Sequence, residues 1–114
     1  MPRPAQALPD QSLDALGNET RREILRALAE SPRTVGALAR EFPISRPAVS
    51  RHLRVLEEAS LVRHVSTGTT NVYEVDPRGF DAARKWLDGF WDIALARFKL
   101  LAENTAREDE DERG

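Results

Sequence analysis

The stretch SRPAVSRHLRVLEEASLV, Ser45 to Val62, places three arginines and a histidine in a chain whose formal net charge is -2. Its apolar residues Val49, Leu53 and Leu56 recur at helical spacing, so they form one stripe that can pack on a core. The arginines occupy the other faces of the same helix. We therefore predict an amphipathic helix whose exposed basic face meets a polyanion.

The residues before this helix predict a second helix a short distance away. Thr34 is placed to cap a helix with an apolar face over residues 35–42, and Pro43 ends it. Ser45 can cap the next helix, with Pro47 in the first turn, where a missing N–H costs nothing. Two short helices joined by a tight turn are typical of a helix-turn-helix.

Two further helices and a hairpin are predicted on either side of this motif. Apolar residues at helical spacing precede it, with a break at Gly17-Asn18 and a stop at Ser31-Pro32. After it, RHVSTGTTNVYEV, residues 63–75, has two extended runs around Gly68, as in a β-hairpin. The order of elements indicates a winged helix-turn-helix, a mainly α fold with a small β-hairpin.

The motif and the segments after it carry a family resemblance. The run SRPAVSRHLRVLEEASLV, the hairpin and DPRGFDAARKWLDGFWD, residues 76–92, resemble the ArsR/SmtB-type winged helix-turn-helix repressors of bacteria over residues 12–103. The resemblance implies a homodimer that binds an inverted-repeat operator in double-stranded DNA and represses transcription. Two departures are a serine at 60, where glycine is usual, and Thr69-Thr70-Asn71, where arginine is frequent. We therefore expect a weak wing contact.

The polar face of the basic helix and the hairpin tip supply the candidate DNA contacts. Arg46 and Arg51 lie in the N-terminal half, where a guanidinium can span guanine O6 and N7, whereas Arg54 is better placed for phosphate. His52 is expected to orient the motif or to touch phosphate. The candidate DNA-binding residues are Thr34, Arg46, Pro47, Ser50, Arg51, His52, Arg54, Thr67, Thr69 and Thr70.

The segment from Phe80 to Ala106 predicts a long helix with apolar residues on more than one face. A second copy of the chain is the simplest partner for the face that its own domain leaves uncovered. A wholly internal helix and an effector pocket lined by Trp86 and Trp91 remain as alternatives, and no small-molecule effector is assigned. The candidate dimer-interface residues are Leu13, Leu16, Phe80, Leu87, Phe90, Trp91, Ala94, Phe98 and Leu101.

The charge distribution predicts the domain organisation. The last seven residues, EDEDERG, contribute -4, so residues 1–107 sum to +2. We expect residues 107–114 to form an acidic, disordered tail. Residues 1–11 are expected to be a flexible N-terminal arm, and residues 12–106 a single winged helix-turn-helix domain with its C-terminal dimerisation helix.

Several classes of function are not expected. The resemblance implies one of two metal sites, a cysteine cluster near the basic helix or Asp and His pairs on the last helix. The chain has no cysteine, and its two histidines, His52 and His64, lie outside the last helix, so neither ligand set can form. We therefore predict no metal site and no cofactor. Ser50 and His52 point about 200° apart on a helix and cannot form a catalytic dyad, so an enzyme is not predicted.

The chain is also expected to be cytoplasmic and to have no membrane partner, because no apolar run approaches the roughly 18 to 20 residues of a membrane span. Its start has no secretory h-region. The alternative function that stays open is a winged-helix adaptor that binds another protein.

Overall fold

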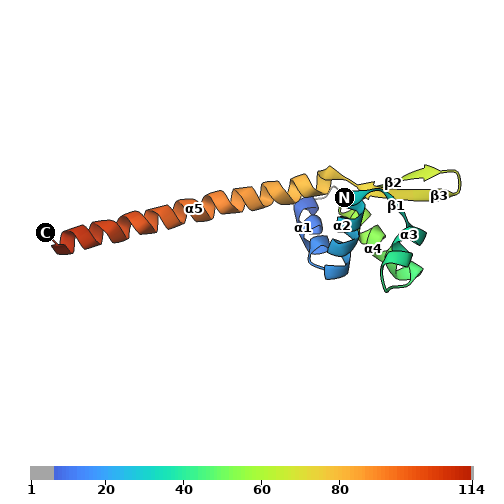
Figure 1. The fold of residues 1–114 in the computed structure, drawn as a ribbon. Helices are drawn as coiled ribbons and strands as arrows, with labels where there is room; N and C mark the ends of the chain where they lie inside the picture. Colours follow the sequence, from blue (N-terminus) through green and yellow to red (C-terminus); the bar gives the residue numbers. More distant parts are fainter. Residues whose placement is uncertain (1–6, 114) are drawn as a thin grey trace. The chain divides into compact units, whose positions relative to one another are not determined.

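The computed structural model describes residues 7–113, which form five helices and a small sheet (Figure 1). The elements in chain order are α1 (Ala7–Leu16), α2 (Glu19–Glu30), β1 (Arg33–Thr34), α3 (Val35–Glu41), α4 (Arg46–Glu58), β2 (Val62–Thr67), β3 (Thr70–Val75) and α5 (Pro77–Arg113). The predicted mainly α fold with a winged helix-turn-helix order is confirmed. The chain divides into two compact units, residues 1–83 and 84–114.

Side-chain caps set the starts of the helices in the first unit. The Thr34 hydroxyl accepts a hydrogen bond from the Ala37 N–H at 3.1 Å, and the Ser45 hydroxyl accepts one from the Ala48 N–H at 3.3 Å. Both caps were predicted and are confirmed. Asn18 caps α2 in the same way. Each cap satisfies a backbone donor that the helix itself leaves unpaired.

The core of the first unit lies between α1, α2, α3, α4 and the start of β2. Its buried apolar residues are Ala15, Ile24, Leu25, Leu28, Leu38, Val49, Leu53, Leu56, Ala59, Leu61 and Val62. The predicted stripe of α4, Val49, Leu53 and Leu56, is fully buried. This packing holds the opposite, polar face of α4 toward solvent.

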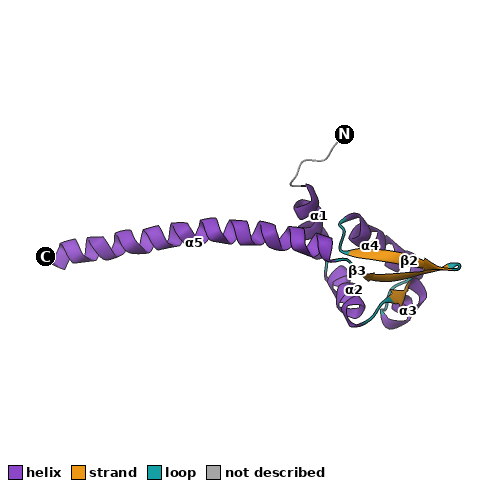
Figure 2. Cartoon of the chain, turned by 90° about the horizontal axis from the view of Figure 1, so that it is seen from above, coloured by secondary structure: helices purple, strands orange, loops and turns teal. Residues whose placement is uncertain are grey.

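The three strands form an antiparallel sheet in the order β1-β3-β2. The predicted hairpin is present, with Val62 paired to Val75 at its base and Thr67 to Thr70 at its tip. Figures 1 and 2 show the tip of this hairpin extending past α3 and α4. The strand β1 was not predicted, because two residues have no periodicity and their pairing with β3 depends on the tertiary fold.

Both ends of the described chain are more helical than we expected. Helix α1 begins at Ala7, inside the range taken for a flexible arm, while residues 1–6 lie outside the described residues. Helix α5 continues through Arg113 instead of giving way to a disordered tail at 107. Glu and Arg are good helix formers. Glu103, Arg107 and Asp111 also follow one another at i, i+4 spacing, so opposite charges lie next to each other on one face and stabilise the helix.

Candidate nucleic-acid interface

The polar face of α4 is exposed as predicted. Arg46, Pro47, Ser50, Arg51 and Arg54 are all exposed, whereas the apolar stripe of the same helix is buried. The helix thus presents guanidinium and hydroxyl groups along one surface, with two of the three arginines in its N-terminal half. Such a surface has the donors that recognise phosphate oxygens and the acceptor atoms of guanine.

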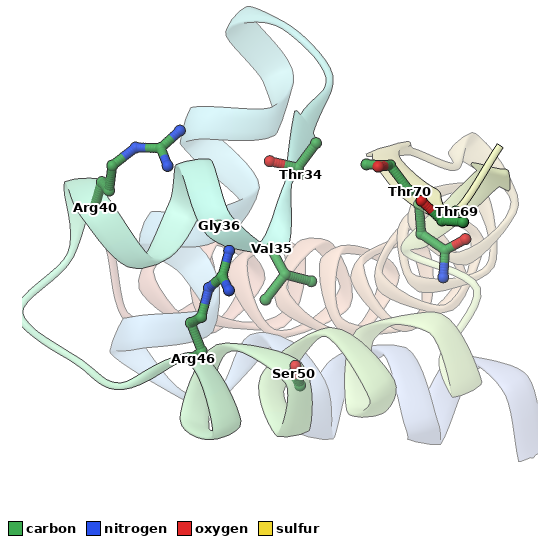
Figure 3. Close-up of a pocket in the computed structure, with 9 residues that line it drawn as sticks. Thr34, Val35, Gly36, Arg40, Arg46, Ser50, Thr69 and Thr70 are labelled. Carbon is green, nitrogen blue, oxygen red and sulfur yellow. The ribbon is translucent and has the colours of Figure 1, made fainter. Parts of the chain in front are cut away.

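A recess lies between the start of α3, the N-terminal half of α4 and the wing tip (Figure 3). It brings together five of the predicted contact residues from three separate elements. Four further residues line it that the sequence did not single out, because only the fold brings α3 and Asn71 beside α4. The lining residues are Thr34, Val35, Gly36, Arg40, Arg46, Ser50, Thr69, Thr70 and Asn71.

The Arg46 guanidinium occupies one side of this recess. It lies against Gly36 on α3, so closely that a Cβ at position 36 would collide with it. Figure 3 shows the side chain rising from α4 toward α3, with Ser50 further along the same helix. The absence of a side chain at Gly36 therefore leaves the space that Arg46 takes, and a glycine there has a local steric reason.

Ion pairing divides the arginines between 33 and 63 into two groups. Arg33 pairs with Glu30 and Glu41, and Arg63 pairs with Glu74 on the neighbouring strand. Within residues 7–113, the other four arginines of this stretch make no ion pair with the protein, and they are Arg40, Arg46, Arg51 and Arg54. The uncompensated positive charge thus gathers on α3 and α4.

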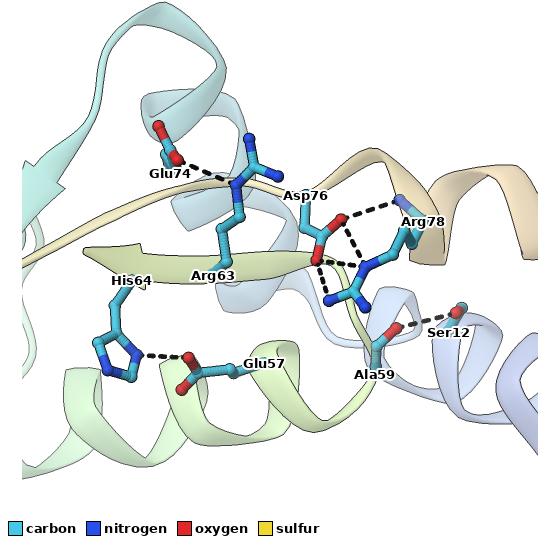
Figure 4. A network of polar contacts seen from close by, with 8 residues as sticks. All are labelled: Ser12, Glu57, Ala59, Arg63, His64, Glu74, Asp76 and Arg78. Atoms are coloured by element: carbon cyan, nitrogen blue, oxygen red, sulfur yellow. Dashed lines mark hydrogen bonds and ion pairs between the residues drawn. The ribbon is translucent and has the colours of Figure 1, made fainter.

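His52 and His64 differ in their surroundings. His52 is half-buried, and burial first, then the charges of Arg21 and Arg51, lower the pKa of its imidazole from the ordinary value. It is therefore mainly neutral at neutral pH. His64 on β2 has its Nδ1 in hydrogen-bond contact with a carboxylate oxygen of Glu57 on α4, which links the base of the wing to the helix (Figure 4). Neither histidine is among the residues that line the recess.

The wing tip is small, polar and exposed. Gly68 has a φ of 64°, and the Thr67 hydroxyl donates to the Thr70 carbonyl at 3.4 Å. Ser66 bonds the side chain of Asn71 at 2.8 Å across the hairpin. Thr67 therefore braces the turn and does not line the recess, whereas Thr69 and Thr70 do.

The second unit carries an exposed apolar surface. Phe90 is 56% exposed, Trp91 55% and Phe98 58%, and Trp86 stacks on Phe90 with ring centroids 5.6 Å apart. The exposed large apolar residues of this helix are Trp86, Leu87, Phe90, Trp91, Ile93, Phe98, Leu100 and Leu101. We call them the α5 apolar face. So large an uncovered patch is unusual on a single folded chain.

The remaining interface candidates are more covered. Leu13 and Ala94 are half-buried, while Leu16 and Phe80 pack against the core of their own unit. Sequence spacing did not separate these residues from the exposed ones. The spacing of apolar residues along a helix does not show which of them pack against the same chain and which remain exposed.

Within the described residues, no three or more His, Asp or Glu side chains are grouped as metal ligands. In the same part of the chain, no helix combines the length and the apolar character that crossing a membrane requires.

Comparisons with known proteins agree with this geometry. A family model described as a helix-turn-helix domain matches residues 16–65. The HTH-type transcriptional regulator Rv2034 of Mycobacterium tuberculosis is 48% identical over 96 residues, which cover 84% of this chain and 90% of that protein. The solved structure of an ArsR-like transcriptional regulator from Rhodococcus sp. RHA1 is 32% identical with a TM-score of 0.72, and the match covers 86% of this chain and 93% of that one. The chain belongs to the ArsR family.

This ArsR-family protein is a DNA-binding transcriptional regulator, as its sequence predicted. A further relative, the transcriptional repressor SdpR of Bacillus subtilis, is 30% identical over 76 residues, which cover 67% of this chain and 84% of SdpR. The matched helix-turn-helix residues include α3 and α4 in full, and thus the whole exposed basic surface described above.

Proposed function

We propose that this regulator is a homodimeric repressor without catalytic activity, which binds an inverted-repeat operator through α4 and the wing. The observation that carries the proposal is the set of four arginines on α3 and α4 that face solvent without a partner in the described chain. Free guanidinium groups on a helix-turn-helix are suited to a DNA backbone and to guanine edges. Repression is supported by the similarity to SdpR and by the family resemblance of the motif.

The contacts divide between base reading and backbone binding. In this proposal Arg51 and Ser50 reach base edges with Pro47 packed beside them, because recognition helices meet bases near their N-terminal ends. Arg46 contacts bases or phosphate from the recess. Arg54, Thr34 and His52 bind or orient the phosphate backbone, and the wing residues Thr67, Thr69 and Thr70 add a weaker contact.

A second copy of the chain is the proposed cover for the α5 apolar face. Its eight residues are between 42% and 75% exposed. With about 100 Å² uncovered on each side chain, the face offers roughly 800 Å² per chain, which is the area that a stable protein–protein interface typically buries on each partner. Dimerisation would place two copies of α4 to read two half-sites.

We also propose that the regulator does not sense metals. The family resemblance implies metal ligands that are either a cysteine cluster near the basic helix or Asp and His pairs on the last helix. The chain has no cysteine, and its histidines lie on α4 and β2. Asp81, Asp88 and Asp92 lie on α5 without an imidazole nearby in sequence.

The experiment that tests the proposal starts from a random duplex library from which the wild-type protein selects its preferred sequence. A two-fold symmetric sequence, with half-sites about one helical turn apart, is the expected result. Arg51→Ala should weaken binding to that duplex by about 1 to 3 kcal/mol and binding to random duplex much less, whereas Arg54→Ala should weaken both and lower the salt slope by about one.

Arg26→Ala is the matched control, because Arg26 is an exposed arginine of α2 that pairs with Glu23 outside this surface. Repression is read from a reporter gene that carries the selected sequence in its promoter. If Arg46→Ala, Arg51→Ala and Arg54→Ala all bind both duplexes like wild type, the basic helix does not read DNA. The protein-interaction adaptor would then be the better account of this surface.

A further inference from the structure

The turn that ends helix α4 joins three other segments of the chain. Helix α4 stops where Ser60 adopts a left-handed φ of 57°, and the Leu61 N–H returns to the Leu56 carbonyl at 2.9 Å. This is the hydrogen-bond pattern of a Schellman cap, which satisfies carbonyls inside the helix. The carbonyls of the next residues, Ala59 to Leu61, are left to bind groups outside it.

Each of these three consecutive carbonyls accepts a hydrogen bond from a different place. The Ser12 hydroxyl on α1 lies 3.1 Å from the Ala59 oxygen, and both groups are buried (Figure 4). The Gly79 N–H in the first turn of α5 donates to the Ser60 carbonyl at 2.8 Å, and the Asp76 N–H donates to the Leu61 carbonyl at 2.9 Å. The end of α4 is therefore bonded to α1, to α5 and to the link between β3 and α5.

Two of these contacts depend on which residue occupies the position, a serine at 12 and a glycine at 79. Ser12 is fully buried, and its Oγ lies within hydrogen-bond distance of the Ala59 carbonyl and of the Leu8 carbonyl of its own helix, which is 2.9 Å away, so these two acceptors share a single hydroxyl hydrogen. At Gly79, a Cβ would lie 2.5 Å from the Ala59 oxygen and 2.6 Å from the Ser60 oxygen. Any larger residue at 79 must push the turn away, because backbone oxygens cannot rotate aside.

We infer that Ser12 and Gly79 are positioning residues for operator recognition, because they fix the tilt of α4 against α1 and the first turn of α5. This inference rests on the proposed binding to a two-fold operator. Hydrophobic contacts of the apolar stripe hold α4 against the core but are not directional. The hydrogen bonds at the end of α4 are directional, so they fix its angle to the neighbouring helices. Helix α4 has 13 residues and is about 20 Å long, so a tilt of about 5° at the junction moves its N-terminal end by roughly 1.7 Å.

A displacement of that size breaks base contacts at the far end of the helix, since hydrogen bonds tolerate only a few tenths of an ångström. Contacts to the phosphate backbone of random DNA require no fixed register with the bases, so a displacement of α4 weakens them less. The junction therefore governs which half-site geometry the regulator accepts more than how tightly it holds DNA in general.

The test compares three duplexes, namely the sequence selected by wild type, the same sequence with one base pair inserted at its centre, and a random sequence. Ser12→Ala removes one oxygen atom and should stay folded, because alanine favours helix. We expect it to reduce the ratio of the affinities for the first two duplexes about fivefold, with affinity for the random duplex and the sedimentation mass unchanged. Ser12→Thr, which keeps the hydroxyl, should restore the ratio.

Gly79→Ala is the second variant and should change the ratio more, because it displaces the turn itself. Ser31→Ala, an exposed serine at the end of α2, is the control and should keep the wild-type ratio. If Ser12→Ala and Gly79→Ala both keep that ratio, or weaken all three duplexes equally, the positioning role is wrong. A wild-type protein that selects no two-fold sequence overturns the proposed function itself, and this inference with it.

Discussion

Replacing Phe90 by aspartate tests whether a second copy covers the α5 apolar face. Phe90 is 56% exposed in the single chain, so about 110 Å² of a phenylalanine surface of roughly 200 Å² remains to be buried. At about 25 cal/mol per Å², its burial contributes roughly 3 kcal/mol per copy, and a two-fold interface contains it twice. Phe90→Asp also brings a carboxylate without a partner into the interface. We expect the dimer dissociation constant to rise by at least a factor of about 10³.

Sedimentation equilibrium at micromolar concentration measures this directly. Wild type should give about twice the chain mass of 12.8 kDa, and Phe90→Asp the mass of one chain. Ala106→Asp is the matched control, because it introduces the same charge at an exposed position of the same helix about 160° away from Phe90, outside the α5 apolar face. A Phe90→Asp protein that keeps the double mass, or an Ala106→Asp protein that dissociates equally, would refute the assignment of this face.

Four further outcomes are expected. Gly36→Ala should leave the melting temperature nearly unchanged, because its Cβ meets only the mobile end of Arg46, but should lower affinity for the selected duplex about fivefold in fluorescence anisotropy. Ser60→Gly should raise the free energy of unfolding by about 0.5 to 1 kcal/mol in urea, because it relieves a left-handed serine. Calorimetric titration with zinc should show no stoichiometric binding, and zinc should leave DNA affinity unchanged. The Arg78 hydrogen bond lowers the pKa of the buried Asp76 carboxyl, so its stabilisation should be present above about pH 4 and lost as the pH falls through that lowered pKa. In urea titrations at a series of pH values, Asp76→Asn should lack this part of the acid sensitivity.

The elements that the sequence predicted are those stabilised by neighbours in the chain. The caps at Thr34 and Ser45 bond backbone groups three residues away, and the apolar stripe of α4 repeats within one helix. A sequence pattern records such local relations directly. The short strand β1 was not predicted, because its pairing partners, Val72 and Tyr73, lie nearly forty residues further along the chain.

The candidate site was predicted in part for the same reason. The exposed face of α4 follows from helical spacing, so Arg51 and Arg54 could be assigned from sequence. The recess could not, because it needs α3, α4 and the wing tip together, and Arg40 and Gly36 enter it only through the fold. The bond from Ser12 to Ala59 spans 47 residues, and a lone serine on a predicted helix gives no sign of it.

The net charge of the chain conceals the surface that matters for its function. Residues 1–83 contain eleven arginines and eleven acidic residues, so this unit is neutral as a whole, and the excess of acidic groups lies in residues 84–114. The positive charge is local because Arg33 and Arg63 are neutralised by glutamates while Arg40, Arg46, Arg51 and Arg54 are not. A neutral unit with one basic surface has little general attraction for polyanions, since long-range attraction follows the net charge and is screened beyond about 10 Å. In the proposed function, its binding energy therefore comes mainly from close contacts at α3, α4 and the wing, where small errors in the placement of α4 have their largest effect.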